Sequence, residues 1–319
     1  MRRRSLLGAS LLSALPLPAL AFPERPVRLV VPFPPGGGAD IVGRTFAELL
    51  SARLGQAVVV ENRAGAGAIP GADHVARSAP DGYTLLLGST GPLAINPALQ
   101  RNLPYDPARD FAAVGVLAYG PAVLVVNPAA LDVADLRQLI ERARAAPGSI
   151  AYASPGVGNI GHLMGEMLKR QAGIDLVHVP YRGAAPALND VLGGRVPLLF
   201  DLIPSAAPNI RAGRLRALGV TGPQRSAMLP DVPTIAEQGL PDFAMTSWFL
   251  VVAPAATPAA AMATLRRALG EVLQDPAARQ RLTALGLDPA TGTEDASGFL
   301  AAELARWAEA VRVSGARVE

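Results

Sequence analysis

Short apolar segments rich in β-branched residues alternate along this chain with longer amphipathic segments. Buried parallel strands read as apolar runs bounded by Gly, Pro or Asn, and successive parallel strands need a crossover, usually a helix. The alternation therefore predicts an α/β architecture with mostly parallel sheets. We expect strands at 27–33, 57–61, 83–88, 122–127, 150–153, 176–179, 197–201, 216–220 and 248–252, and helices at 40–54, 68–78, 133–146, 160–172 and 185–192.

The C-terminal part has a different character, because helical patterns follow one another there with little strand between them. Helices are expected at 258–274, 276–285 and 294–314. Nine strands are many for one sheet, so we expect two α/β lobes. The long apolar segments 119–127 and 247–253 are the candidates for the chain crossing between them.

The composition excludes several classes of site and partner. None of the 319 residues is Cys, which excludes disulfides, thiolate nucleophiles, Cys-ligated metal centres and the lipid anchor of a bacterial lipoprotein. The 29 basic side chains exceed the 26 acidic ones by three, and Arg2, Arg3 and Arg4 account for the difference, since the first 21 residues contain no acid. The rest of the chain is neutral without a basic run, so we expect no nucleic-acid partner.

The first 21 residues have the pattern of a signal peptide. A basic start precedes an apolar run from Leu6 to Leu20, and Ala19 and Ala21 supply the small side chains of a cleavage site. The run is shorter than the ~20 residues of a spanning helix. We therefore expect cleavage after Ala21 and a soluble protein in the periplasm.

Two strand–loop–helix junctions carry clusters of glycine. Residues 31–40 read Val-Pro-Phe-Pro-Pro-Gly-Gly-Gly-Ala-Asp, and residues 152–162 read Tyr-Ala-Ser-Pro-Gly-Val-Gly-Asn-Ile-Gly-His. Glycine permits close approach of the backbone, and the free amides of a helix start bind anions together with the helix dipole. Neither loop contains Arg, so a carboxylate bound here would be neutralised by amides and dipoles. Ser89 and Thr90 offer two hydroxyls at the end of a further strand.

The second loop also matches a dinucleotide fingerprint. Gly156, Gly158 and Gly161 form G-x-G-x-x-G between a predicted strand and helix, and Asp175 follows 19 residues after Gly156. The acidic residue of that motif belongs at the end of the second strand, whereas Asp175 precedes the segment 176–179. A nicotinamide-type oxidoreductase is therefore an unfavoured alternative.

The sequence shows no catalytic constellation, and we expect neither an enzyme nor a cofactor. The three histidines, at 74, 162 and 178, have no metal-ligand spacing, and no G-x-S-x-G elbow is present. Asp201 stands where a catalytic acid could stand and equally where it could cap the turn into Pro204. A third glycine cluster, Gly65 to Gly71, is interpreted as a turn.

Six segments, which follow one another through nearly the whole chain after residue 21, give it a clear resemblance to a known family. It resembles the Bug family, the TctC-like periplasmic substrate-binding receptors of tripartite tricarboxylate transporters. The resembling segments are Pro-Val-Arg-Leu-Val-Val-Pro-Phe-Pro-Pro-Gly-Gly (26–37), Val-Val-Val-Glu-Asn-Arg (58–63), Ala-Pro-Asp-Gly-Tyr-Thr-Leu-Leu-Leu-Gly (79–88), Leu-Pro-Tyr-Asp-Pro (103–107), His-Val-Pro-Tyr-Arg-Gly (178–183) and Leu-Pro-Asp-Val-Pro-Thr (229–234).

The resemblance implies a type II periplasmic-binding fold, in which two α/β lobes close on a cleft like a Venus flytrap. We assign residues 22–121 and 252–319 to lobe 1 and residues 122–251 to lobe 2. The implied ligand is a small carboxylate, whether a di- or tricarboxylate, an amino acid or an aromatic acid, and the implied partner is a membrane permease. By position, the ligand residues are Phe33, Gly37, Gly38, Ala39, Asp40, Ser89, Thr90, Ser154, Gly158, Asn159, His162, Tyr181 and Asp201.

The second loop departs from the family pattern. Pro155, Val157 and Ile160 stand where the family often has more Ser and Thr, which favours a ligand with fewer hydroxyls than citrate. We expect a monomer without metal. A sensing receptor of the same fold, which reports its ligand to a signalling partner, needs the same cleft and stays an alternative.

Overall fold

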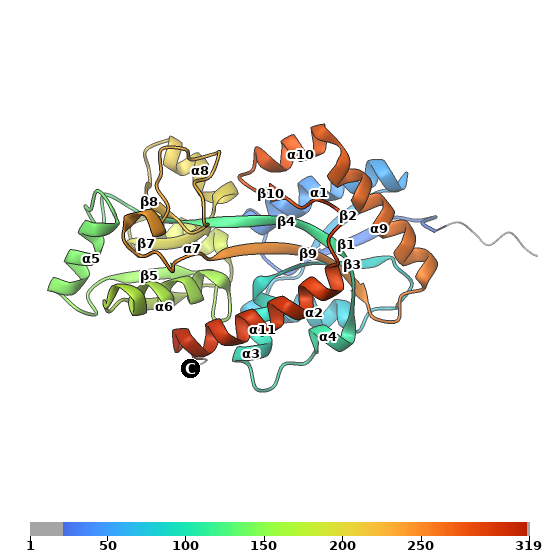
Figure 1. The fold of residues 1–319 in the computed structure, drawn as a ribbon, viewed down its shortest axis with the longest axis horizontal. Helices are drawn as coiled ribbons and strands as arrows, with labels where there is room; N and C mark the ends of the chain where they lie inside the picture. Colours follow the sequence, from blue (N-terminus) through green and yellow to red (C-terminus); the bar gives the residue numbers. More distant parts are fainter. Residues whose placement is uncertain (1–21, 318–319) are drawn as a thin grey trace, which may run out of the picture.

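Two long antiparallel strands, β4 (Phe111–Val126) and β9 (Thr246–Pro254), run through the middle of the molecule and connect its two lobes (Figure 1). The computed structural model describes residues 22–317, so the predicted signal peptide lies outside the described residues. No helix within that range has the length and apolar character needed to cross a membrane.

The first lobe contains three parallel strands, with β1 between β2 and β3. Its helix α1 ends at Gly55, whose positive φ of 66° suits glycine at a helix C-terminus. The elements of this part are β1 (Val27–Val31), α1 (Gly38–Leu54), β2 (Val58–Asn62), η1 (Ala66–Ala68), α2 (Ile69–Ala76), β3 (Thr84–Ser89), η2 (Gly91–Ile95), α3 (Asn96–Leu99) and α4 (Pro107–Asp110).

The second lobe repeats this plan, with β5 parallel to both β6 and β7. Asn159 caps helix α6 by accepting the Gly161 amide at 3.2 Å, and Gly173 ends that helix in the left-handed region. The elements are α5 (Leu136–Ala145), β5 (Ala151–Ser154), α6 (Ile160–Ala172), β6 (Val177–Pro180), α7 (Ala184–Leu192), β7 (Leu198–Leu202), α8 (Ile203–Arg211), β8 (Arg216–Val220) and η3 (Ala236–Gln238).

Strand β4 changes its partners part-way along its length. Residues from Phe111 to Pro121 pair with β9, whereas residues from Ala122 to Val126 pair with β7 and β8. The strand order is β2-β1-β3-β9-β4-β7-β5-β6, so one continuous sheet joins the lobes. The two-lobe α/β fold is confirmed. The expectation of mostly parallel pairing holds only for the outer strands, because every pairing of β4 and β9 is antiparallel.

Three local expectations were wrong. The predicted strand at 122–127 is the second half of β4, whose earlier residues Gly115 and Gly120 resemble strand breaks in the sequence. Helix α8 was missed, although Pro204 is tolerated in a first helical turn. The third glycine cluster is a helix start, since α2 begins at Ile69.

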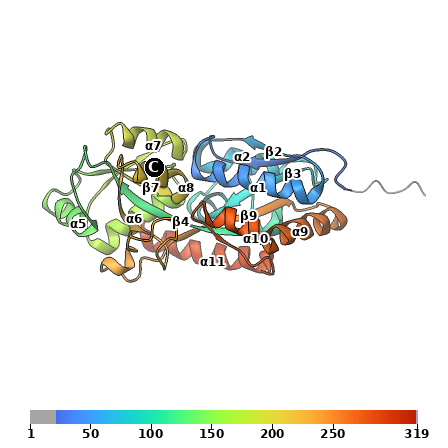
Figure 2. The same cartoon turned by 90° about the horizontal axis from the view of Figure 1, so that it is seen from above.

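The C-terminal helices cover the sheet that the earlier elements build. Helices α9 (Ala259–Gln274) and α10 (Pro276–Thr283) pack beside α1, and the short strand β10 (Asp288–Pro289) adds to β4. Helix α11 (Ala296–Ser314) runs along β4 and reaches α6 of the second lobe (Figure 2). Its Glu303 is buried and accepts hydrogen bonds from the indole nitrogens of Trp248 and Trp307.

We expect Glu303→Ala to lower the free energy of unfolding by about 2–4 kcal/mol, because two buried indole N–H groups lose their acceptor. Glu303→Gln keeps an acceptor oxygen and should cost about half as much. The exposed Glu309 of the same helix, paired with Arg312, is the control, and its replacement by Ala should cost under ~1 kcal/mol. Urea unfolding measures all three, and equal losses for Glu303→Ala and Glu309→Ala would contradict the expectation.

Candidate functional site

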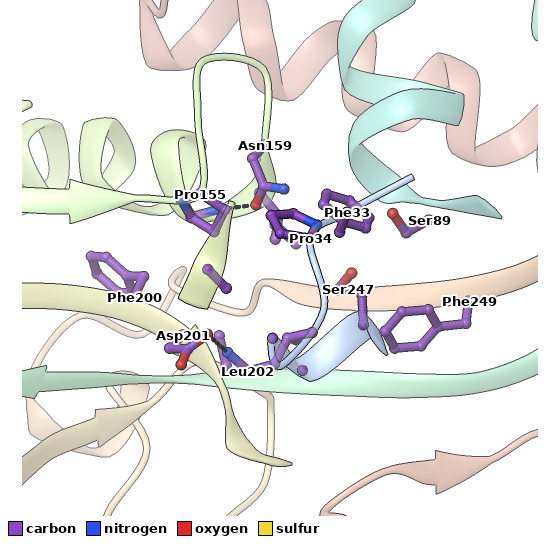
Figure 3. Close-up of a pocket in the computed structure, with 17 residues that line it drawn as sticks. Phe33, Pro34, Ser89, Pro155, Asn159, Phe200, Asp201, Leu202, Ser247 and Phe249 are labelled. Carbon is purple, nitrogen blue, oxygen red and sulfur yellow. Dashed lines mark hydrogen bonds between the residues drawn. The ribbon is translucent and has the colours of Figure 1, made fainter. Parts of the chain in front are cut away.

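A pocket lies between the two lobes, in front of the crossing strands (Figure 3). It encloses about 550 Å³ of empty space, its opening included. Both lobes and the strands β4 and β9 contribute to its wall. Its lining residues are Phe33, Pro34, Gly37, Gly38, Ala39, Ser89, Ala122, Pro155, Asn159, Ile160, Gly161, Ala184, Phe200, Asp201, Leu202, Ser247 and Phe249.

The structure brings about half of the predicted ligand residues together in this wall. Those that line the pocket are Phe33, Gly37, Gly38, Ala39, Ser89, Asn159 and Asp201. Asp40, Thr90, Ser154, Gly158, His162 and Tyr181 lie outside the lining and make other contacts. The structure therefore places these six residues beside the pocket wall and not in it.

Four helices begin at the pocket, and they come from both lobes. Gly38, Ile160 and Ala184 are the first residues of α1, α6 and α7, and Leu202 precedes α8. The first amides of a helix have no partner within the helix. The N-termini of α1, α7 and α8 carry no side-chain cap hydrogen bond. No Arg, Lys or His is in the lining, so the groups there that could attract an anion are backbone amides and helix dipoles.

Asp40 holds the first loop in shape instead of facing the pocket. Its Oδ2 accepts hydrogen bonds from the Gly36 amide and the Arg44 guanidinium, each at 3.0 Å, and its Oδ1 accepts the Asn62 amide at 2.8 Å. The Asn62 side chain also donates to the Phe33 carbonyl. Burial raises the pKa of Asp40, but the three hydrogen bonds outweigh it and the net pKa is lowered.

The second loop rests on a stack of rings, of which Tyr152 and His162 are buried and His178 is partly buried. The imidazoles of His162 and His178 stack at 4.3 Å, and Tyr152 also stacks on His178, at 4.9 Å. Ser154 Oγ lies 2.6 Å from His178 Nε2 and also bonds the backbone of Gly156, so it links the stack to the loop. Burial, the His162 ring and Lys169 lower the pKa of His178 to about 3, so both histidines support the loop as neutral groups.

Two further predicted residues act beside the pocket. Thr90 is fully buried, accepts the Trp248 amide at 3.1 Å and lies 3.2 Å from the hydroxyl of Ser247, which lines the pocket. It therefore ties the end of β3 to β9 and fixes Ser247. The Tyr181 hydroxyl donates to Asp190 at 2.9 Å, which directs it to α7 and away from the lining.

Asp201 is the acidic residue of the lining. Its carboxylate is buried and accepts hydrogen bonds from the Ser205 hydroxyl at 2.7 Å and the Leu202 amide at 2.9 Å, at the start of α8. Of the two roles left open by the sequence, these contacts agree with a place in the turn that leads to Pro204, and the carboxylate accepts no hydrogen bond from an amide within α8. Burial raises the pKa of Asp201 to about 7, although both hydrogen bonds favour the charged form.

The G-x-G-x-x-G loop packs against protein where a dinucleotide would need space. A Cβ placed on Gly158 would overlap Asn96 Oδ1, and the Asp175 carboxylate lies 3.9 Å from Lys169 on the surface. Residues 22–317 contain no group of three or more His, Cys, Asp or Glu that could hold a metal ion.

Sequence reasoning missed the pocket residues of the crossing strands and of β7. Ser247 and Phe249 belong to β9 and Ala122 to β4, and both segments were predicted to cross between the lobes. A crossing segment must pass behind the cleft, so this signal could have found them. Phe200, Leu202 and Ala184 carried no such signal.

Comparison with known proteins places the chain in a family. The family model described as "Tripartite tricarboxylate transporter family receptor" matches residues 42–315. BugT of Bordetella pertussis is 41% identical over 308 residues, which cover 96% of this chain and 94% of BugT. The chain belongs to this receptor family. The predicted resemblance to Bug receptors is thereby confirmed.

Solved structures of similar receptors share its fold. A protein of R. palustris solved with adipate has a TM-score of 0.89 at 37% identity and covers 93% of this chain and all of its own. The periplasmic binding protein BugD gives 0.88 at 34%, covering 93% of this receptor and all of BugD. MatC from Rhodopseudomonas palustris, solved with malate, gives 0.84 at 33%, covering 91% and all of MatC.

We expect Asp201→Asn to stabilise the receptor, and to do so more at pH 8 than at pH 4. The folded pKa of about 7 exceeds the ordinary value of 3.8, so the unfolded chain loses its proton first as the pH rises. The free energy of unfolding that the parent loses by ionising this buried carboxyl therefore grows from about pH 4 and levels off above the folded pKa. It reaches roughly 2–4 kcal/mol.

Thermal unfolding of both proteins across this pH range measures the effect. Ser205→Ala is the matched control, because it removes a hydrogen bond to the ionised carboxylate and should destabilise the receptor most at high pH. A melting-temperature difference between Asp201→Asn and the parent that is the same at pH 4 and pH 8 would show that the carboxyl titrates normally.

Proposed function

We propose that this receptor captures a small carboxylate-bearing ligand between its lobes and delivers it to the membrane permease of a tripartite tricarboxylate-type transporter. The observation that carries the proposal is the set of three helix N-termini without a side-chain cap, α1, α7 and α8, at a pocket whose lining has no basic side chain. A ligand carboxylate would accept the hydrogen bonds that the helices leave unmade.

The apolar wall supports a ligand with an apolar body and few hydroxyls. Phe33, Phe249 and Ile160 line the pocket, and the polar side chains beside them are Ser89, Ser247, Asn159 and Asp201. The adipate and malate bound by the two R. palustris relatives are small dicarboxylates, which makes them the first probes. Adipate, with no hydroxyl, suits the apolar wall better than malate does.

The remaining features of the proposal concern location and form. Cleavage after Ala21 would release a mature periplasmic receptor that begins at Phe22, acts as a monomer and catalyses no reaction. Lobe 1 would comprise residues 22–121 and 252–319, and lobe 2 residues 122–251. The partner change of β4 between Pro121 and Ala122 supports the first of these boundaries.

A thermal-shift screen of mono-, di- and tricarboxylates, amino acids and aromatic acids tests the proposal. A ligand at 100 times its Kd adds about 2.7 kcal/mol of stability, which is roughly 5–11 °C in melting temperature. A shift with carboxylates alone supports the proposal. A shift with pyridine nucleotides alone would instead revive the oxidoreductase alternative, and no shift with any acid would contradict carboxylate capture.

Substitutions of Asn159 can distinguish the effect of charge on carboxylate binding from the effect of capping on the stability of α6. Asn159→Asp keeps an oxygen that caps α6 and should leave the melting temperature of the free receptor nearly unchanged. Its added negative charge in the pocket wall should weaken carboxylate binding, measured by calorimetry, at least tenfold more than a neutral variant that caps the helix.

Asn159→Ser is the neutral control for this charge. It also caps the helix and should weaken binding by about 1–3 kcal/mol at most, through one lost hydrogen bond. If Asn159→Asp bound the carboxylate as well as Asn159→Ser does, the ligand would not present its negative charge to the start of α6.

A further inference from the structure

Several glycines of the receptor lie against the opposite lobe. We call this set the glycine seam; it comprises Gly36, Gly37, Gly38, Gly67 and Gly91 of the first lobe and Gly158 and Gly183 of the second. Only Gly37 and Gly38 also line the pocket. At Gly36, Gly67, Gly158 and Gly183 a positive φ also favours glycine, whereas Gly91 has neither a positive φ nor a place in the pocket lining, so its lack of a side chain needs another explanation.

One side of the seam lies where the first loop meets the start of α7. A Cβ placed on Gly37 would lie 3.2 Å from the Cβ of Ala184, and one on Gly36 would lie 3.9 Å from the Cβ of Ala185. A Cβ on Gly183 would overlap the ring of Pro34. The backbone of each lobe thus packs directly on the other lobe.

The other side of the seam lies where the second loop meets η1, η2 and α3. A Cβ on Gly91 would lie 3.2 Å from the Gly158 carbonyl oxygen and 3.6 Å from Asn159 Cα. A Cβ on Gly67 would lie 3.1 Å from the Val157 carbonyl oxygen, and one on Gly158 would overlap Asn96 Oδ1. Asn96 is fully buried and donates to the Gly67 carbonyl at 2.6 Å.

These contacts surround the pocket and join only surfaces that separate when the lobes part. We propose that the glycine seam is the closing surface of the receptor, and that glycines outside the pocket set ligand affinity by permitting backbone-to-backbone contact between the lobes. The proposal rests on the proposed function, in which closure traps the ligand. An added side chain in the seam would lower the population of the closed state, and the apparent affinity falls by the same factor.

Gly91 offers the sharpest substitution. Its backbone is outside the left-handed region, so alanine is not strained there, and the three heavy atoms nearest to an added Cβ all belong to Gly158 and Asn159. Gly91→Ala therefore disturbs the lobe contact without a clash inside its own lobe. Gly270→Ala in α9 is the matched control, because an added Cβ there meets nothing within 4 Å.

Calorimetry with adipate and with malate measures the first effect. Whichever of the two probes the parent receptor binds, we expect Gly91→Ala to bind it about tenfold more weakly than the parent does. The melting temperature of the free Gly91→Ala protein should stay within a few degrees of that of the parent. Gly270→Ala should bind as the parent does. Equal affinities of Gly91→Ala and the parent would overturn the proposal.

A second arm needs no ligand and separates this proposal from the proposed function. The chain contains no Cys, and the 3.9 Å between the Cβ positions of residues 36 and 185 lies within the range of a disulfide. The double variant Gly36→Cys, Ala185→Cys should therefore cross-link under mild oxidation. Because residue 36 has a φ of 85°, which strains any side chain, the double variant Gly36→Ser, Ala185→Ser is the control, and its melting temperature shows that the strained receptor still folds. Adding Gly91→Ala should slow the cross-linking severalfold, whereas adding Gly270→Ala should not.

The outcomes of the two arms are distinct. One outcome is a cysteine pair that cross-links, and more slowly with Gly91→Ala, in a receptor that binds neither probe. That result would contradict the proposal that adipate or malate is the ligand, and it would support the glycine seam as the closing surface. A cysteine pair that fails to cross-link, or cross-links equally fast with Gly91→Ala, would overturn the seam whatever the receptor binds.

Discussion

The antiparallel ladder between β4 and β9 is the constraint on which the rest of the receptor depends. It pairs residues from Phe111 with Pro254 to Pro121 with Thr246, after which β4 continues into the second lobe beside β7 and β8. Because both lobes share these strands, the distance between the two glycine loops is set by how the strands twist. The ladder also supplies the back wall of the pocket and anchors α11, through the bond from the Trp248 indole to Glu303.

Recognition of an anion without a basic side chain requires that the supporting side chains add no competing charge. Asp40 meets this requirement because its carboxylate is engaged by Gly36, Arg44 and Asn62. The stacked histidines also add no positive charge of their own, because burial lowers their pKa and keeps them neutral. Asp201 meets it in part, since its raised pKa reduces its negative charge near neutral pH. The uncapped amides of the helix starts are therefore the groups left to attract an anion in the pocket.

The sequence predicted the lobes, most elements and seven of the seventeen residues that line the pocket, for reasons that differ between residues. Strand and helix periods are local, so α6 (Ile160–Ala172) and β8 (Arg216–Val220) were predicted to the residue. The sixteen-residue length of β4 depends on pairing with strands that are distant in the sequence. The glycines within β4 resemble strand breaks, so the sequence alone does not indicate this length. The orientation of a loop side chain depends on its neighbours in space: Tyr181 turns to Asp190, and nothing nearby in the sequence indicates this.

Glycine has two roles in the loops, and together they limit the size of the ligand. At Gly38 the backbone both lines the pocket and packs against Leu202, so contact with a ligand and contact between the lobes occur at one residue. Backbone contacts cannot lengthen as flexible side chains can, so the closed pocket has one set of dimensions. A ligand too long for it would hold Gly91 away from Gly158 and lose the seam, whereas a ligand that is too short would leave a helix N-terminus without an acceptor. If the glycine seam closes as proposed, the receptor would select its ligand by length as much as by charge.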